Sequence, residues 1–254
     1  MQEPIPGTLT GPNGNQIAYV RTNGKAPGII FLGGYMSDMT GTKALSLEML
    51  CREIGHTCIR FDYSGHGLSE GQFQAGTIST WTNDTLAVLD NIAVGPQILV
   101  GSSMGGWIML LVALARKRQV TGLVGIASAS DFTRRLAEDE LTDEQITEIY
   151  RDGSTTIKSP YAEDPYIFTR TLLEDGAKHL LLDRKIELNC PVRLLHGLLD
   201  SSVPWQNSLA LANALTSKDV ELTLVKTGDH RLSKESDIIR LRKIVADLIA
   251  SAGR

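Results

Sequence analysis

Short apolar-rich runs alternate along the chain with segments in which apolar residues recur every three or four positions. The runs lie at 28–32, 57–61, 97–100, 122–127, 192–196 and 221–226. Runs of this kind are typical of strands buried on both faces, as in a parallel sheet covered by helices. The helical pattern falls at 44–54, 80–93, 107–116, 208–215 and 234–249. The alternation predicts an α/β fold with a mostly parallel central sheet flanked by helices.

Two segments depart from this alternation. The turn Gly11-Pro12-Asn13-Gly14 separates the apolar segments 8–10 and 17–20, which predicts an opening antiparallel hairpin. Residues 131–183 carry many charges, two prolines and no good strand pattern. We therefore expect one domain over residues 1–254, with a helical insertion at about 131–183 between two strands of the sheet.

Composition narrows the partners and the compartment. A net charge of -4 and 6% aromatic residues argue against nucleic acid as the main partner. The three cysteines, at 51, 58 and 190, lack metal-ligand spacing, which predicts no metal, no disulfide framework and a reducing compartment. Apolar runs are too short for a transmembrane segment, and the first residues do not resemble a leader. We expect a cytoplasmic protein, or a mitochondrial matrix protein if a leader was removed.

The motif Gly101-Ser102-Ser103-Met104-Gly105 lies between a predicted strand and a predicted helix. In that context Gly-x-Ser-x-Gly is typical of a sharp turn that holds a nucleophilic serine in a strained conformation. Side chains two residues to either side would collide, which explains both glycines. The motif predicts Ser103, rather than the adjacent Ser102, as nucleophile; the alternative is a glycine-rich turn selected only for tight packing.

A serine hydroxyl needs a base, usually a histidine. The five histidines are His56, His66, His179, His196 and His230. His230 follows the last predicted strand, at the same sheet edge as Ser103, and is the expected base. His56 is expected at the far edge and His179 in the insertion. His66 could line the entrance to the site, and His196 is expected to pack against its neighbours.

A carboxylate is needed to orient the base and to stabilise it when protonated. Asp200 follows the strand before the last one and is expected at the same sheet edge. Of its competitors, Asp62 is expected to brace its own loop, and Asp229 adjoins the histidine and should point elsewhere. The chain order serine, aspartate, histidine then follows.

Two backbone N–H groups are the expected donors to an oxyanion beside Ser103. Met104 opens the helix after the serine, where N–H groups lack partners within the helix. Tyr35 follows Gly33-Gly34 after the strand 28–32, and glycines allow a close approach of the backbone to substrate. Tyr35 and Met104 are the predicted oxyanion donors; alternatively, the two glycines only form a turn.

With these residues in place, nearly the whole chain resembles the serine α/β-hydrolase superfamily. Several segments are similar to one branch: YMSDMTGTKAL (35–45), CIRFDYSG (58–65), PQILVGSSMGGW (96–107), CPVRLLHG (190–197), VPW (203–205) and DHR (229–231). That branch is the mitochondrial family of acyl-protein (palmitoyl) thioesterases and acyl-glucuronide esterases. The resemblance implies Ser103 as nucleophile, Asp200 as acid and His230 as base. Gly33 stands where the superfamily often has a histidine, which leaves the N–H donor intact.

The expected activity is hydrolysis of a thioester or carboxylic ester through an acyl-enzyme, with no metal or cofactor. A small-ester carboxylesterase and a carbon–carbon bond hydrolase use the same three residues and stay open as alternatives. Serine at the turn argues against dehalogenases and epoxide hydrolases, which attack with a carboxylate. The non-enzyme alternative is an inactive ligand-binding module, which would normally have lost one of the three residues.

The insertion is expected to form a helical cap over this site. Its apolar side chains either wall an acyl pocket or pack the cap onto the core: Ile146, Ile149, Tyr150, Tyr161, Tyr166, Ile167 and Phe168. The expected partner is an acyl ester or thioester, including an acylated protein. Nothing in the sequence indicates an oligomeric state.

Overall fold

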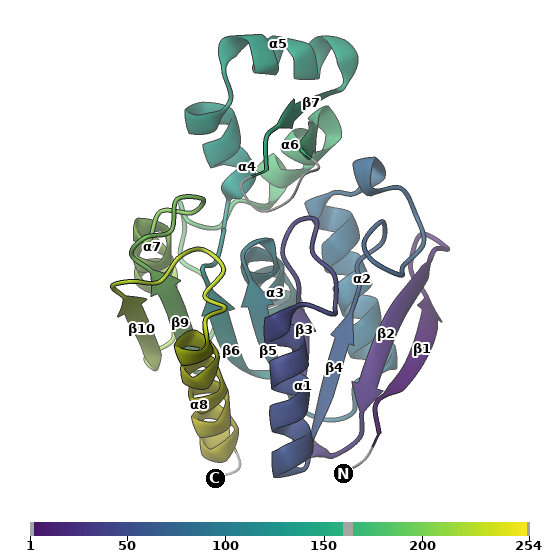
Figure 1. Ribbon diagram of the computed structural model, residues 1–254, viewed down its shortest axis with the longest axis vertical. Coiled ribbons are helices and arrows are strands. Elements are labelled where there is room, and N and C mark those ends of the chain that lie inside the picture. Colours follow the sequence, from purple (N-terminus) through teal and green to yellow (C-terminus); the bar gives the residue numbers. More distant parts are fainter. Residues whose placement is uncertain (1–2, 160–164, 253–254) are drawn as a thin grey trace.

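The computed structural model describes residues 3–159 and 165–252. Within them the central sheet has eight strands, in the order β1-β2-β4-β3-β5-β6-β9-β10 (Figure 1). The strands are β1 Ile5–Thr10, β2 Gln16–Thr22, β3 Lys25–Leu32, β4 His56–Phe61, β5 Gln97–Ser102, β6 Val120–Ile126, β9 Val192–Gly197 and β10 Val220–Val225. β1 pairs antiparallel with β2, and β2 with β4, while the pairs from β4 to β10 are parallel. The predicted opening hairpin and mostly parallel sheet are confirmed.

Helices cover both faces of this sheet (Figure 1). The helices α1 (Thr42–Ile54) and α8 (Glu235–Ala252) share one apolar layer with the sheet, in which Leu47 and Val245 of the helices lie with Ile29 and Val100 of the strands. On the other face α2 (Ile78–Asn91), α3 (Met104–Ala115) and α7 (Gln206–Ala214) bury a larger layer, which includes Ile30, Leu99, Trp81 and Trp107. Successive residues of a strand point to opposite faces. Burial on both faces therefore explains why the inner strands β5 and β6 are largely apolar, whereas the edge strand β10 has only half-buried and exposed residues.

The parallel strands place three sequence-distant segments at one edge. Ser103 directly follows β5, Asp200 follows β9, and His230 follows β10. Because the carboxyl ends of parallel strands meet at the same edge, crossover helices bring these residues together without direct sequence proximity.

Residues 131–183, called the inserted segment below, lie between β6 and β9 and stand above this edge of the sheet (Figure 1). They contain α4 (Phe132–Arg135), a π-helical turn (Leu136–Glu140), α5 (Asp143–Asp152), β7 (Ser154–Ile157), β8 (Tyr166–Thr169), α6 (Arg170–Gly176) and a 3-10 turn (Ala177–His179). The expectation that the inserted segment lacks strands is wrong, because β7 and β8 pair antiparallel. Each has four residues, too few to show a clear alternation, and their pairing depends on contact across the segment.

The apolar residues of the inserted segment have divergent surroundings. Ile149 and Phe168 are buried in the larger apolar layer. Tyr150 is 55% exposed, with the guanidinium of Arg170 5.3 Å from its ring centre, so Tyr150 does not wall an enclosed pocket in this structure. Tyr161 lies outside the described residues.

Candidate active site

Ser103 occupies the sharp turn between β5 and α3. Its backbone angles, φ 54° and ψ -119°, are unusual for a residue with a side chain. The turn is held from both sides, since Ser103 N–H donates to Ile126 O at 2.9 Å and Ser103 O accepts from Ala129 N–H at 3.0 Å. The helix begins at Met104, three residues earlier than the sequence pattern predicted, so Ser103 stands directly at its N-terminus.

Both glycines of the turn are sterically required. A Cβ atom on Gly101 would lie 2.3 Å from Gly105 O, and a Cβ atom on Gly105 would lie 2.3 Å from Leu32 O. Both obstacles are backbone atoms, which cannot rotate away as a side chain can. The predicted collision is therefore confirmed.

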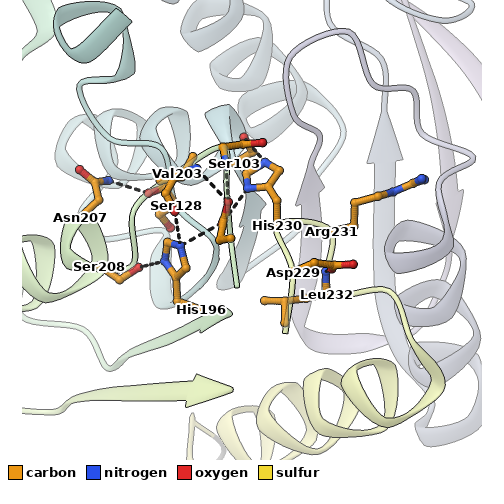
Figure 2. A network of polar contacts seen from close by, with 12 residues as sticks. Ser103, Ser128, His196, Val203, Asn207, Ser208, Asp229, His230, Arg231 and Leu232 are labelled. Atoms are coloured by element: carbon orange, nitrogen blue, oxygen red, sulfur yellow. Dashed lines mark hydrogen bonds and ion pairs between the residues drawn. The ribbon is translucent and has the colours of Figure 1, made fainter. Parts of the chain in front are cut away.

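Ser103, His230 and Asp200 form one chain of hydrogen bonds, of which Figure 2 labels Ser103 and His230. Asp200 Oδ2 lies 2.8 Å from His230 Nδ1, and His230 Nε2 lies 3.1 Å from Ser103 Oγ. A carboxylate accepts hydrogen bonds, so Nδ1 carries the proton and Nε2 can accept the proton of the hydroxyl. The Asp200 side chain is fully buried and that of His230 is 14% exposed. This arrangement can activate a serine hydroxyl.

Asp200 is held as an anion despite its burial. Burial alone would raise the pKa of the Asp200 carboxyl, but hydrogen bonds from His196 and His230, the His230 charge and a backbone hydrogen bond together hold it well below its usual range. Its other oxygen, Oδ1, accepts from the N–H groups of Ser202 and Val203, both at 2.8 Å. The carboxylate therefore stays ionised and fixed in orientation.

The contact between Asp200 and His196 was missed by the sequence reasoning. His196 is fully buried, as expected of a packed residue, but its Nε2 lies 3.1 Å from Asp200 Oδ2. The spacing His196-x-x-x-Asp200 is a signal only when the chain turns back directly after the strand. That turn is closed locally by Asp200 N–H, which donates to Gly197 O at 3.3 Å, but it is also held from outside, since Leu199 N–H donates to Gly228 O at 2.9 Å.

The backbone at 33–35 lies against the nucleophile. A Cβ atom on Gly34 would stand 3.3 Å from Ser103 Cβ, so a side chain there would crowd the serine. Tyr35, the residue that follows, has a side-chain contact that the sequence did not suggest. Its hydroxyl donates to Ile167 O of β8, and its ring stacks on Phe168 with 5.3 Å between ring centres. Burial raises the pKa of the Tyr35 phenol, which keeps it a neutral donor.

His66 does not line the entrance to the site. It is 4% exposed and packs edge-on against the rings of Tyr63, Phe73 and Trp81, with ring centres 5.0 to 5.6 Å away. Burial lowers the pKa of His66 to about 4, against a smaller opposite effect of its hydrogen bond to Ser64. It is therefore a neutral ring within an aromatic cluster.

The remaining competitors lie away from the serine. His56 Nδ1 donates to Pro27 O at 2.9 Å at the start of β4, and His179 Nε2 lies 2.7 Å from Ser79 Oγ. Asp62 accepts from the N–H groups of Met39 and Leu68, at 2.7 and 2.8 Å, and thus braces its own loop as expected. Asp229 likewise points elsewhere, because its carboxylate accepts from Leu232 N–H at 2.9 Å.

Residues 3–159 and 165–252 contain no cluster of three or more histidine, cysteine, aspartate or glutamate side chains able to hold a metal ion. None of the helices in these described residues has the length and apolar character needed to cross a membrane.

Comparisons with known proteins agree with this geometry. The profile of the prolyl oligopeptidase family matches residues 90–251, and that of serine aminopeptidase, S33, matches residues 29–150. The mitochondrial palmitoyl-protein thioesterase ABHD10 of Homo sapiens is 43% identical over 242 residues, which cover 95% of this chain and 79% of that protein. The Mus musculus protein of the same name is 46% identical over 236 residues, which cover 92% of this chain and 78% of that protein.

Solved structures give the same answer. A protein of Agrobacterium vitis S4, described as a hydrolase, superposes with a TM-score of 0.93 at 44% identity, over 98% of this chain and 99% of that one. ABHD10 from mouse superposes with a TM-score of 0.90 at 43% identity, over 97% and 99%. The chain belongs to the serine α/β-hydrolase superfamily, as its motifs predicted, and within it to the ABHD10 family of hydrolases.

Proposed function

We propose that this chain hydrolyses acyl thioesters and carboxylic esters through an acyl-enzyme formed on Ser103. The observation that carries the proposal is the hydrogen-bonded chain from Ser103 Oγ through His230 to Asp200. The supporting argument is chemical: an acyl-transfer enzyme needs a nucleophile, a base with the correct nitrogen free, and a buried anion behind that base.

In the first step Ser103 Oγ attacks the acyl carbonyl carbon while His230 Nε2 takes the hydroxyl proton. The carbonyl electron pair moves to the oxygen, giving a tetrahedral oxyanion. When this pair returns, the bond to sulfur or oxygen breaks and the leaving group takes the proton from His230. Water, activated by the same nitrogen, then releases the acid and regenerates Ser103.

The backbone N–H groups of Tyr35 and Met104 are the proposed oxyanion donors. Met104 is the first residue of α3, where the helix has N–H groups without partners of its own. The close approach of Gly34 to Ser103, with 3.3 Å from a Cβ atom on Gly34 to Ser103 Cβ, supports the N–H of the following residue, Tyr35, as the second donor. Each such donor contributes about 3 kcal/mol to transition-state stabilisation.

We propose acyl thioesters of proteins as the substrate class, since the relatives are named palmitoyl-protein thioesterases. In this proposal residues 1–254 form one domain, and the inserted segment caps the site above Ser103. A long apolar groove under this cap would favour long acyl chains, because each buried methylene contributes about 0.8 kcal/mol, whereas a short, closed pocket would favour small esters.

Labelling with a fluorophosphonate tests the nucleophile directly. The reagent should label the wild type on Ser103, and Ser103→Ala should lose both labelling and thioester turnover while its circular dichroism stays unchanged. Ser102→Ala is the matched control, because this neighbour is 8% exposed at the end of β5 and should keep the label. Label retained in Ser103→Ala would refute the assignment.

A chain-length series tests the substrate class. Acyl-coenzyme A thioesters and p-nitrophenyl esters from two to sixteen carbons would be compared by kcat/KM. The proposal expects kcat/KM to rise with chain length in the thioester series. A preference for the shortest acyl groups would instead support the small-ester carboxylesterase.

We propose a reducing compartment as the location, either the bacterial cytoplasm or the mitochondrial matrix. The thiols of Cys51, Cys58 and Cys190 are all free, and the first two are buried. The relatives carry the word mitochondrial in their names. Cell fractionation of the native source, with markers for each compartment, would separate the two locations.

A further inference from the structure

His196 is the penultimate residue of β9 and contacts Asp200 of the proposed triad; Figure 2 shows His196 together with Ser103 and His230. Its ring is fully buried, and both nitrogens have polar neighbours. Nε2 lies 3.1 Å from Asp200 Oδ2 and 3.0 Å from Val203 O, while Nδ1 lies 2.7 Å from Ser208 Oγ. The proposed mechanism makes no use of this ring.

These neighbours determine which nitrogen carries the proton. Val203 O is a carbonyl oxygen and can only accept, so Nε2 must be the protonated nitrogen. The same N–H then also donates to Asp200 Oδ2. On the other side of the ring, Nδ1 is satisfied by the Ser208 hydroxyl. His196 thus donates to the carboxylate through Nε2–H.

The partner of Nδ1 is itself held in place. Ser208 is 1% exposed on α7, and the residue before it, Asn207, donates from Nδ2 to Ser128 O at 2.7 Å (Figure 2). This bond ties α7 to the loop after β6. Ring rotation of His196 would therefore break hydrogen bonds on both nitrogens inside a packed site, where unpaired polar groups are costly.

Asp200 Oδ2 consequently serves two imidazoles at once. It accepts from His230 Nδ1 at 2.8 Å and from His196 Nε2 at 3.1 Å, whereas Oδ1 accepts backbone N–H groups. A donor on Oδ2 withdraws negative charge from the oxygen that faces His230. The charged groups that act on this carboxylate are His230 and, from α4, Arg135.

We propose that His196 is a positioning residue of the hydrolytic site: by donating to Asp200 Oδ2 it fixes the carboxylate and sets the pH at which His230 becomes a free base. This inference rests on the proposed function. Without His196, Asp200 would place its full charge on His230 and hold the proton there more tightly. The acidic limb of the pH profile would then move to higher pH.

The test compares kcat/KM profiles of His196→Phe, which removes the donor, and His196→Gln, whose amide can replace Nε2–H. We expect the acidic limb of His196→Phe to move up by about one pH unit, which is about a tenfold loss of kcat/KM on the acidic side. His196→Gln should lie between it and the wild type. His56→Gln, at the opposite edge of the sheet, is the matched control and should not shift the limb.

An unshifted limb in His196→Phe, a shift to lower pH, or a glutamine variant no closer to the wild type than phenylalanine would overturn the inference. If His196→Phe does not fold, nitrogen-15 NMR of the wild type decides instead. His196 should carry a proton on Nε2 across the acidic limb, and a ring with only Nδ1 protonated would contradict the proposal. A wild type without turnover or fluorophosphonate labelling would refute the proposed function itself, which separates the two failures.

Discussion

Tyr35→Phe tests whether the inserted segment is anchored to the loop that carries the proposed oxyanion donor. The Tyr35 hydroxyl donates to Ile167 O of β8, and the same ring stacks on Phe168 and lies edge-on to Phe73 and Trp81. One side chain thus joins the core loop, the inserted segment and the aromatic cluster beside α2. Phenylalanine keeps the ring contacts and deletes only the hydrogen bond.

The magnitude follows from burial of the bond. Deleting the donor from a buried hydrogen bond leaves the carbonyl unsatisfied, which costs about 1 to 3 kcal/mol. If that energy is lost from docking, the population with an undocked segment rises by about 5- to 150-fold. If docking and global unfolding are coupled, the melting temperature falls by about 2 to 4 °C per kcal/mol for a chain of this size.

Native-state hydrogen exchange measures this change locally. Amides of β7 and β8 should exchange faster in Tyr35→Phe by the factor above, while amides of β5 and β6 in the sheet should change much less. Tyr150→Phe is the matched control, because it also removes a tyrosine hydroxyl, here from a side chain of the inserted segment that is 55% exposed. It should leave the exchange of β7 and β8 unaltered.

Equal exchange of β7 and β8 in Tyr35→Phe and wild type would refute the reasoning. It would mean either that water replaces the hydrogen bond of the Tyr35 hydroxyl at no cost when the segment undocks, or that other contacts alone hold β8 in place. An equal acceleration in the central strands would also count against it, because the bond would then stabilise the whole fold rather than the docking of the inserted segment.

Three further predictions concern stability. Gly105→Ala puts a Cβ atom 2.3 Å from Leu32 O. This clash should lower the free energy of unfolding by about 3 kcal/mol or more. A urea midpoint equal to that of the wild type would contradict this prediction. The folded-state pKa of Asp200 lies below its usual value. The ionised carboxylate therefore stabilises the fold above about pH 4, and this effect is lost as the pH falls further. The difference in the free energy of unfolding between wild type and Asp200→Asn should shrink below that pH. Burial, with a contribution from Arg231, lowers the pKa of Lys43 to about 8. From about pH 8 to 10.4 the unfolded chain therefore binds more protons than the folded chain, and the free energy of unfolding should rise with pH across that range. In chemical unfolding measured at several pH values, Lys43→Met should lose this rise.

The sharp turn at Ser103 could be predicted because its causes are local. A strand before the serine, a helix after it, and glycines that avoid backbone collisions all lie within a few residues of Ser103. The long-range partners could be placed at the correct edge only because parallel strands share their carboxyl ends. The sheet edge at which Asp200 and His230 lie, and their order along the chain, were predictable, whereas the distances between their side chains were not.

Residues whose surroundings come from several elements were harder to predict. His66 was expected near the entrance, but three aromatic rings from the core and from its own loop enclose it. The strands β7 and β8 have four residues each and gain their conformation from pairing with each other. No periodicity within such short segments reveals a partner strand elsewhere in the chain.

By itself the sequence determined the alternation of buried strands and helices, the strained turn at Ser103 and the order serine, aspartate, histidine, because backbone sterics and hydrophobic periodicity act between near neighbours. Only the tertiary structure decided that Asp200 Oδ2 serves both His196 and His230, and that the Tyr35 hydroxyl reaches Ile167 of the inserted segment. Those contacts join groups from different strands and loops. Their geometry exists only once the sheet has brought these groups to one edge and excluded water from between them.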